Sequence, residues 1–170
     1  MNAAPYHFEP IAAHHEAAFK AMLKEPHVRP WWGEGDHEWK LVLEGEASGE
    51  SRGFAVFQNQ IFFGYVQVWV PNWAPEHLLE EPWQADAPDG TRGIDITLAS
   101  AGLGHGAKIV RAFANMLFAE GIGRLTIDPD VGNVRALRAY EKAGFRIFDE
   151  SYKDSHSVIL MELMPQWPKP

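Results

Sequence analysis

Residues 93–145 read GIDITLASAGLGHGAKIVRAFANMLFAEGIGRLTIDPDVGNVRALRAYEKAGF, and this stretch decides the fold. From Gly93 to Ala99, apolar residues alternate with polar or small ones, which is the period of a strand. Three glycines, Gly102, Gly104 and Gly106, then interrupt the alternation. Apolar residues after Gly106 recur at helical spacing. The stretch therefore predicts a strand, a glycine-rich turn and a helix.

Such a turn directs unpaired backbone N–H groups and the positive end of a helix dipole at one point, which suits a phosphate. A P-loop needs Lys and then Ser or Thr after its last glycine, whereas Ala107 and Lys108 follow here. The dinucleotide fingerprint needs G-x-G-x-x-G, and these glycines read G-x-G-x-G. A coenzyme A pyrophosphate turn fits better. The alternative is a tight turn that serves only close packing.

The second half of the stretch predicts another strand and another helix. Residues 125–127 are a short apolar strand that Asp128-Pro129 ends. Asn133 is a favourable N-cap for a helix over residues 134–143, and Gly144 favours a left-handed end. The pattern N-x-x-A-x-x-x-Y-E-K-x-G-F over residues 133–145 strongly resembles the last helix of the GCN5-related N-acetyltransferases.

Further motifs are similar to bacterial aminoglycoside 6'-N-acetyltransferases: R-G-I-D at 92–95, G-x-G-x-K-x-V-R-A at 104–112, D-P at 128–129 and Trp-Trp-Gly at 31–33. This resemblance implies an α/β fold with a mixed sheet of six to seven strands, about four flanking helices and a splayed central strand pair. It implies an acetyl-CoA-dependent enzyme that acetylates a primary amine of an aminoglycoside or a similar polycationic amine. One residue departs: Ala101 stands where the wider family has Arg or Gln, so backbone amides must carry most of the phosphate binding.

The resemblance also implies roles for single residues. Asp95 would face the acceptor amine and take its proton, and Tyr140 would protonate the leaving thiolate. A solvent-facing strand carboxylate and a core tyrosine are the respective alternatives. Asp128 would contact the acceptor, although a D-P turn explains it equally well. The residues implied for coenzyme A are Ile96, Thr97, Leu98, Leu103, Gly104, His105, Gly106, Ala107, Lys108, Asn133 and Tyr140.

Two other segments are candidates for the acceptor site. Trp31 and Trp32 are adjacent and cannot both face a core, so one lines something else, and the resemblance favours a substrate wall. Residues 73–90 break all periodicity and mix tryptophans with acids such as Glu81. A long loop of this kind suits an amino-sugar pocket, in which carboxylates pair with ammonium groups. A packed tryptophan loop and a solvated acidic loop are the alternatives.

Elsewhere the patterns predict strands at 6–8, 54–57, 61–70, 146–152 and 157–163. Pro10 is expected in the first turn of a helix, Asp36 is expected to cap a short helix, and residues 45–53 are expected to form a loop. The helix over residues 134–143 is expected to turn Val134 inward. We expect one domain over residues 1–164 and a flexible tail at 165–170.

The bulk composition narrows the function. A net charge of −8 argues against a nucleic-acid partner and suits a cationic substrate, although acidity also serves solubility. The absence of cysteine excludes disulfides and a thiolate nucleophile. No apolar run reaches the length of a membrane span and no signal sequence is expected, so we predict a cytoplasmic protein. Its oligomeric state, monomer or homodimer, stays open. His15-Glu16 begins a zinc-protease pattern, but Phe19 occupies the second ligand position, so no metal site is predicted.

Two other functions stay open. The wider group that carries a tryptophan-rich first loop includes acetyltransferases for siderophore precursors such as N-hydroxylated lysine. A non-catalytic acyl-CoA sensor would have the same cofactor turn. The response to a panel of amine acceptors discriminates between the three functions.

Overall fold

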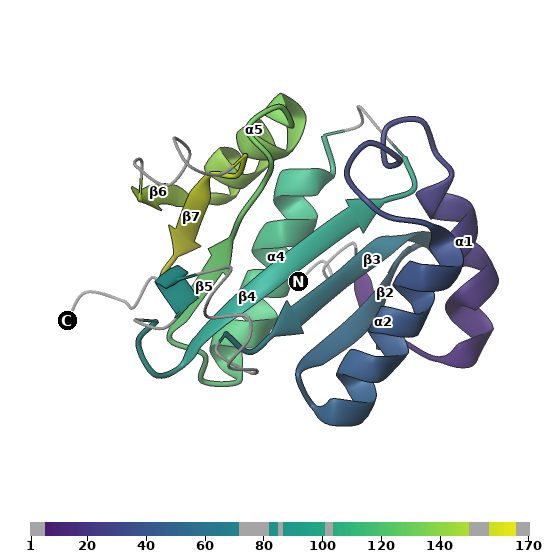
Figure 1. Cartoon of the computed structure of the whole chain (residues 1–170), viewed down its shortest axis with the longest axis horizontal. Helices are drawn as coiled ribbons and strands as arrows, with labels where there is room; N and C mark the ends of the chain where they lie inside the picture. The colour runs from purple at the N-terminus through teal and green to yellow at the C-terminus, as the bar shows by residue number, and fades with distance from the viewer. Residues whose placement is uncertain (1–5, 72–81, 85–86, 101–103, 150–156, 166–170) are drawn as a thin grey trace.

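The computed structural model describes residues 6–71, 82–84, 87–100, 104–149 and 157–165 (Figure 1). They form a seven-stranded mixed sheet in the order β1-β2-β3-β4-β5-β7-β6, with four α-helices among the described residues. The strands are β1 (His7–Pro10), β2 (Ser51–Gln58), β3 (Ile61–Trp69), β4 (Thr91–Leu98), β5 (Arg124–Ile127), β6 (Arg146–Asp149) and β7 (Leu160–Leu163). The helices are α1 (Glu16–Leu23), α2 (Gly35–Ser48), α4 (Gly106–Ala119) and α5 (Val134–Ala143), with 3-10 turns η1 (Ala13–His15) and η2 (Pro82–Gln84). The predicted fold class is confirmed.

The helices cover both faces of the sheet, α1 and α2 on one and α4 and α5 on the other (Figure 1). The larger core lies under α4, whose buried stripe includes Ile109, Phe113 and Leu117. A smaller core lies under α1 and α2, where Phe19 and Tyr65 are fully buried. The sheet therefore separates two apolar layers, and a site that spans both must pass through it.

Such a passage exists because β4 and β5 part. These parallel strands pair only from Thr91 to Gly93 with Arg124 to Thr126, whereas β4 continues to Leu98 alongside β3. Ala99 N donates to Phe63 O at 2.9 Å, which fixes the hydrogen-bonding parity of the ladder. By this parity, the N–H and C=O groups of Ile96 and Leu98 point away from β3 and into the gap. The predicted splayed strand pair is therefore confirmed.

Local signals determine the two helices of the decisive stretch. α4 begins at Gly106, as predicted. α5 covers residues 134–143, where Asn133 Oδ1 accepts from Ala136 N at 3.2 Å and Gly144 closes the helix at φ 100°. Val134, expected to face inward, is instead 51% exposed at the start of α5.

The structure corrects the other local predictions. Pro10 ends the edge strand β1, where its missing N–H costs no ladder hydrogen bond. Glu34 caps α2 in place of Asp36, because its carboxylate accepts from the N–H groups of Asp36 and His37 at 2.9 and 3.3 Å. The loop predicted at 45–53 is mostly regular structure, because α2 continues to Ser48 and β2 begins at Ser51. β7 is shorter than the predicted strand at 157–163, and β6 covers 146–149, the part of the predicted strand at 146–152 that lies within the described residues. None of the described helices has the length and apolar character to cross a membrane.

Candidate active site

The first cleft lies between the end of β4, the start of α4 and α5, and has a volume of about 340 Å³. Its lining contains the cations Arg135, Arg138 and Lys142, and no carboxylate among the described residues. We call it the cationic cleft. It includes nine residues that the sequence assigned to the cofactor: Ile96, Thr97, Leu98, Gly104, His105, Gly106, Ala107, Asn133 and Tyr140. Of the other two, Lys108 is exposed and is not part of this lining, and Leu103 lies outside the described residues.

The glycine turn presents backbone donors to this cleft. Gly104 has a φ of 70°, a backbone conformation in which a residue with a side chain would be strained. Gly106 and Ala107 open α4, so their N–H groups belong to the helix's first turn and have no intrahelical acceptor. The His105 ring packs on Phe63 at 4.9 Å between ring centroids, and its Nδ1 is hydrogen bonded to the Tyr6 hydroxyl at 2.7 Å. These contacts hold the turn that offers the anion site.

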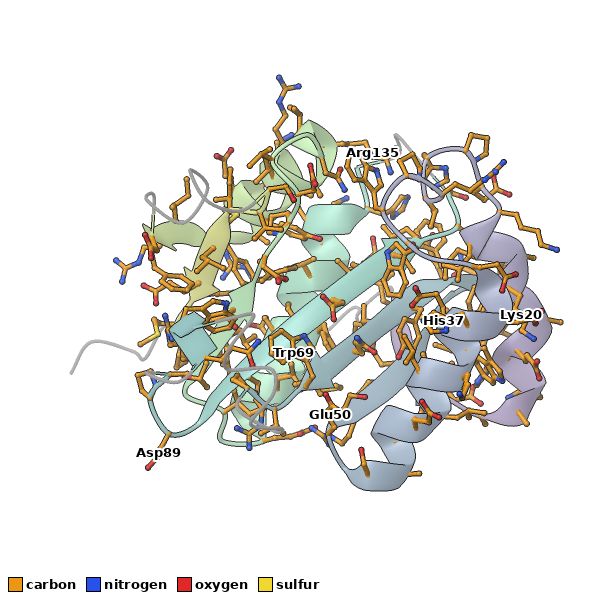
Figure 2. The ribbon with its side chains drawn as sticks, in the orientation of Figure 1. Lys20, His37, Glu50, Trp69, Asp89 and Arg135 are labelled. Carbon is orange, nitrogen blue, oxygen red and sulfur yellow. The ribbon has the colours of Figure 1, made fainter. Side chains whose placement is uncertain are left out.

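The basic residues of α5 were missed by the sequence analysis. Arg135, Arg138 and Lys142 are three and four residues apart, so they share one exposed side of α5, whereas Tyr140 is buried on another side of this helix. Figure 2 shows Arg135 at the upper edge of the molecule, and it belongs to the first turn of α5. A count of basic residues at helical spacing would have found them. His27 was also missed, and its Nε2 donates to Leu98 O at 2.8 Å on the free edge of β4.

The second cleft lies among the loop that carries Trp31 and Trp32, α2, β4 and the connection from β5 to α5, and it has a volume of about 470 Å³. Its described lining has no Lys or Arg but has four carboxylates, Glu38, Asp95, Asp128 and Asp130. We call it the anionic cleft. Asp95 and Asp128 were predicted for the acceptor, whereas Glu38 and Asp130 were not. Glu81 lies outside the described residues.

The two clefts share a wall made of Trp31, Trp32, Ile96, Asn133 and Tyr140. Trp32 turns toward the smaller core, with its ring edge-on to those of Phe19 and Tyr65. Trp31 is 41% exposed. The adjacent tryptophans thus face different surroundings, and a group bound in one cleft can reach a group bound in the other beside Tyr140.

Asp95 sits on β4 within hydrogen-bonding distance of β3. Gln67 Nε2 donates to Asp95 Oδ2 at 2.7 Å, and the two residues are paired across the strands. Burial raises the pKa of the Asp95 carboxyl, and the charge of Glu38 raises it further, against hydrogen bonds from Gln67 and Trp69 that lower it. A carboxylate with a raised pKa is a stronger base toward a bound ammonium group.

Tyr140 is 7% exposed at the wall between the clefts. Burial raises its pKa far above the ordinary value of 10.0, and the charges of Asp95 and Asp128 add to the shift. The hydroxyl therefore keeps its proton at neutral pH. It can donate a hydrogen bond, or its proton, to a group that gains negative charge.

One other cluster of possible ligands lies away from both clefts. Glu9, His14 and His15 offer ligand atoms within 4.8 Å of one another, a set that the sequence pattern did not indicate. His15 Nδ1, however, accepts from Ala12 N at 3.0 Å. The neutral ring then carries its proton on Nε2, which faces Glu9 at 3.4 Å. That nitrogen carries the ring proton and makes no hydrogen bond of its own among the described residues, so it is not available as a metal ligand.

Comparisons with known proteins agree with this geometry. A family model described as an acetyltransferase (GNAT) domain matches residues 12–152. The aminoglycoside N(6')-acetyltransferase type 1 of Klebsiella pneumoniae is 32% identical over 146 residues, which cover 79% of this chain and 71% of that protein. A kanamycin resistance protein of Rhizobium radiobacter is 45% identical over 67 residues, 37% of this chain and 62% of that protein. The solved structure of the aminoglycoside acetyltransferase AAC(6')-Ib with coenzyme A and kanamycin matches with a TM-score of 0.80, at 27% identity over 95% of each chain.

Proposed function

The chain belongs to the acetyltransferase (GNAT) family, and we propose that it transfers the acetyl group of acetyl-CoA to the 6'-amino group of an aminoglycoside or a similar polycationic amine. One observation carries the proposal: a cationic cleft and an anionic cleft meet at Tyr140. An anionic cofactor and a cationic acceptor would each find the opposite charge. Both solved and curated relatives with aminoglycoside names support this substrate class.

The cationic cleft has the groups that coenzyme A needs. Its phosphates would lie near Gly106, Ala107 and the basic side of α5, where backbone donors and cations are both present. The amide groups of its pantetheine arm would meet the backbone groups of Ile96 and the N–H of Leu98, which point into the gap, whereas Leu98 O accepts from His27. Acetyl-CoA supplies the acetyl group in an activated form, as a thioester.

Residues of the shared wall and of the anionic cleft beside it would then divide the chemistry. Asp95 holds the acceptor ammonium and takes one proton from it, so that the nitrogen can form the new C–N bond. Tyr140 donates its proton to the sulfur when the C–S bond breaks, and a second proton from the acceptor nitrogen then passes to the Tyr140 oxygen, which leaves a neutral amide and restores the hydroxyl. The N–H of Ile96 faces the gap and would hydrogen bond the carbonyl oxygen. Holding the two reactants together in the shared space supplies much of the acceleration.

The rivals have less support. N-hydroxylated lysine carries a carboxylate, which four carboxylates in the anionic cleft would repel. A sensor needs neither a partly buried Asp95 nor a protonated Tyr140 beside the acceptor space. For an enzyme that consumes acetyl-CoA, we propose the cytoplasm as the place of the reaction.

An acetyl-CoA thiol-release assay across amine acceptors tests the proposal. We expect turnover with kanamycin or tobramycin and a product that mass spectrometry shows to be acetylated at the 6' nitrogen. Turnover of N-hydroxylysine alone would replace the substrate class. Tight acetyl-CoA binding without thiol release on any amine would favour the sensor.

A further inference from the structure

Asp95 is the end of a hydrogen-bonded chain that begins in the smaller core. The Tyr65 hydroxyl donates to Gln67 Oε1 at 2.9 Å, and Gln67 Nε2 donates to Asp95 Oδ2 at 2.7 Å. Tyr65 and Gln67 are two residues apart on β3, so their side chains share one face of the sheet. Gln67 pairs with Asp95 on β4, which brings the amide onto the carboxylate.

The chain has one consistent direction. An ionised Asp95 requires a donor, so the NH₂ end of the Gln67 amide must face it. The carbonyl end then faces Tyr65, whose hydroxyl must donate. Burial raises the pKa of Tyr65 far above its ordinary value, so this proton stays in place. A reversed amide would place its oxygen against the carboxylate.

Tyr65 is itself held rigidly. It is fully buried, and its ring stands edge-on to Phe19 at 5.0 Å and to Trp32 at 6.2 Å between centroids. Gly53 leaves room for its hydroxyl, since a Cβ there would lie 2.5 Å from the hydroxyl oxygen. The orientation of the carboxylate thus derives from a packed aromatic cluster.

We propose that Gln67 is a positioning residue for Asp95 and that Tyr65 locks the Gln67 amide in the orientation that does so. The proposal rests on the function proposed above, in which Asp95 receives the proton of the acceptor amine. Trp69, two residues further along β3, supplies a second hydrogen bond to Asp95. Figure 2 shows Trp69 over the middle of the sheet.

A neutral amide serves this purpose better than a cation. Lys or Arg beside Asp95 would pair with the carboxylate and compete with the acceptor ammonium for it. The groups that face Asp95 across the anionic cleft are Glu38 from α2, Asp128 and Asp130 from the β5–α5 connection, and Tyr140 from α5, none of them cationic. Gln67 fixes the direction of the carboxylate and leaves its charge for the acceptor. Each carboxylate oxygen accepts more than one hydrogen bond, so capacity remains.

Three variants test the chain. Gln67→Met removes the donor at similar volume, and we expect kcat to fall roughly 10- to 100-fold with little change in KM for acetyl-CoA. The acidic limb of kcat/KM should move to higher pH, since the lost hydrogen bond had lowered the pKa of Asp95. Tyr65→Phe should move both quantities in the same direction by less. The double variant should be no worse than Gln67→Met alone, because Tyr65 acts through Gln67.

The controls separate positioning from packing. Gln58→Met makes the same exchange at the end of β2, and it should leave kcat and the pH profile unchanged. Melting temperatures of all variants show whether each one folds. Additive losses in the double variant, or an unmoved acidic limb in Gln67→Met, would overturn the proposal.

An NMR titration of the Asp95 carboxyl carbon, without any acceptor, provides a readout that does not depend on turnover. The pKa of Asp95 should be higher in Gln67→Met than in the wild type, and equal values would overturn the positioning role. If the wild type acetylates no amine, the proposed function fails and this titration still decides whether Gln67 positions Asp95.

Discussion

The cationic and anionic clefts share five wall residues but are built from different parts of the chain. The cationic cleft draws mostly on the continuous stretch from Ile96 to Lys142, and it offers backbone groups as well as side chains. The anionic cleft gathers side chains from Pro30 to Val158, and its carboxylates come from three separate segments. The comparison teaches that one cleft follows from local chain geometry, whereas the other depends on how distant elements pack.

The largest expected effect is on the anionic side. Asp95→Asn should lower kcat/KM by about 10²- to 10⁴-fold, because the base beside the reacting nitrogen is lost while its shape is kept. Steady-state kinetics with acetyl-CoA and kanamycin measure the loss. A variant that retains a third of the wild-type activity would show that another group, or water alone, receives the proton.

Relative to the wild type, Asp95→Asn should also become more stable as pH rises. Burial raises the pKa of Asp95 in the folded protein above its ordinary 3.8. The stability that this raised pKa contributes to the wild type is therefore complete below about pH 3.8 and is lost as pH rises through the raised pKa. Asn does not ionise, so the melting temperature of the variant relative to the wild type should increase over that range. Melting curves at pH 4 and pH 8 check the sign, and an equal difference at both would contradict it.

On the cationic side, a charge reversal should affect the cofactor alone. Lys142→Glu should raise KM for acetyl-CoA by about tenfold with little change in kcat, because it places a carboxylate against the phosphates. Lys40→Glu is the matched control, since it changes the net charge equally from an exposed position on α2. If both variants raise KM for acetyl-CoA equally, the net charge of the protein, and not the charge of the cationic cleft, determines the affinity for the cofactor.

Salt should lower kcat/KM for polycationic acceptors, by a smaller factor than the change in KM expected for Lys142→Glu. Screening of the carboxylate field should reduce kcat/KM for kanamycin several-fold between about 50 and 500 mM salt. An acceptor with a single ammonium group should respond less. Equal salt responses of the two acceptors would show that the field of the anionic cleft does not attract the substrate.

The smallest effect is expected at Glu38. Glu38→Gln should raise KM for the acceptor about two- to fivefold, since its oxygen can still accept from Gly33 N while its charge is lost. The acidic limb of kcat/KM should move to lower pH, because the charge of Glu38 raises the pKa of Asp95. This shift is opposite to the one expected for Gln67→Met, so a common direction would contradict one of the two assignments.

Local signals explain what the sequence could predict. Asn133 and Gly144 bound α5 through contacts within a few residues, and the predicted helix matches the observed one. The extent of α2 could not be found this way. Gly45 reads as a loop residue, yet it lies inside α2. Glycine is needed there because a Cβ would meet the Ser51 hydroxyl at the start of β2.

The same distinction applies to the candidate site. The basic side of α5 could have been predicted from the spacing of its residues in the sequence. Glu38 and Asp130, in contrast, are separated by 92 positions and line the same cleft only in the folded protein. Neither lies in a motif. The link from Tyr65 through Gln67 to Asp95 needs the register of β3 and β4, which alternation alone does not determine.

The gap between β4 and β5 has a consequence for how such an enzyme can evolve. An exposed strand edge usually pairs with other chains. This edge lies inside the sheet, with α4 and α5 over one face, so a narrow molecule that carries amide groups can bind it more readily than another strand can. Main-chain groups recognise that molecule, and they persist when side chains change. Descendants of this chain can therefore exchange the residues around the acceptor, and so acquire new amines, without losing the donor of the acetyl group.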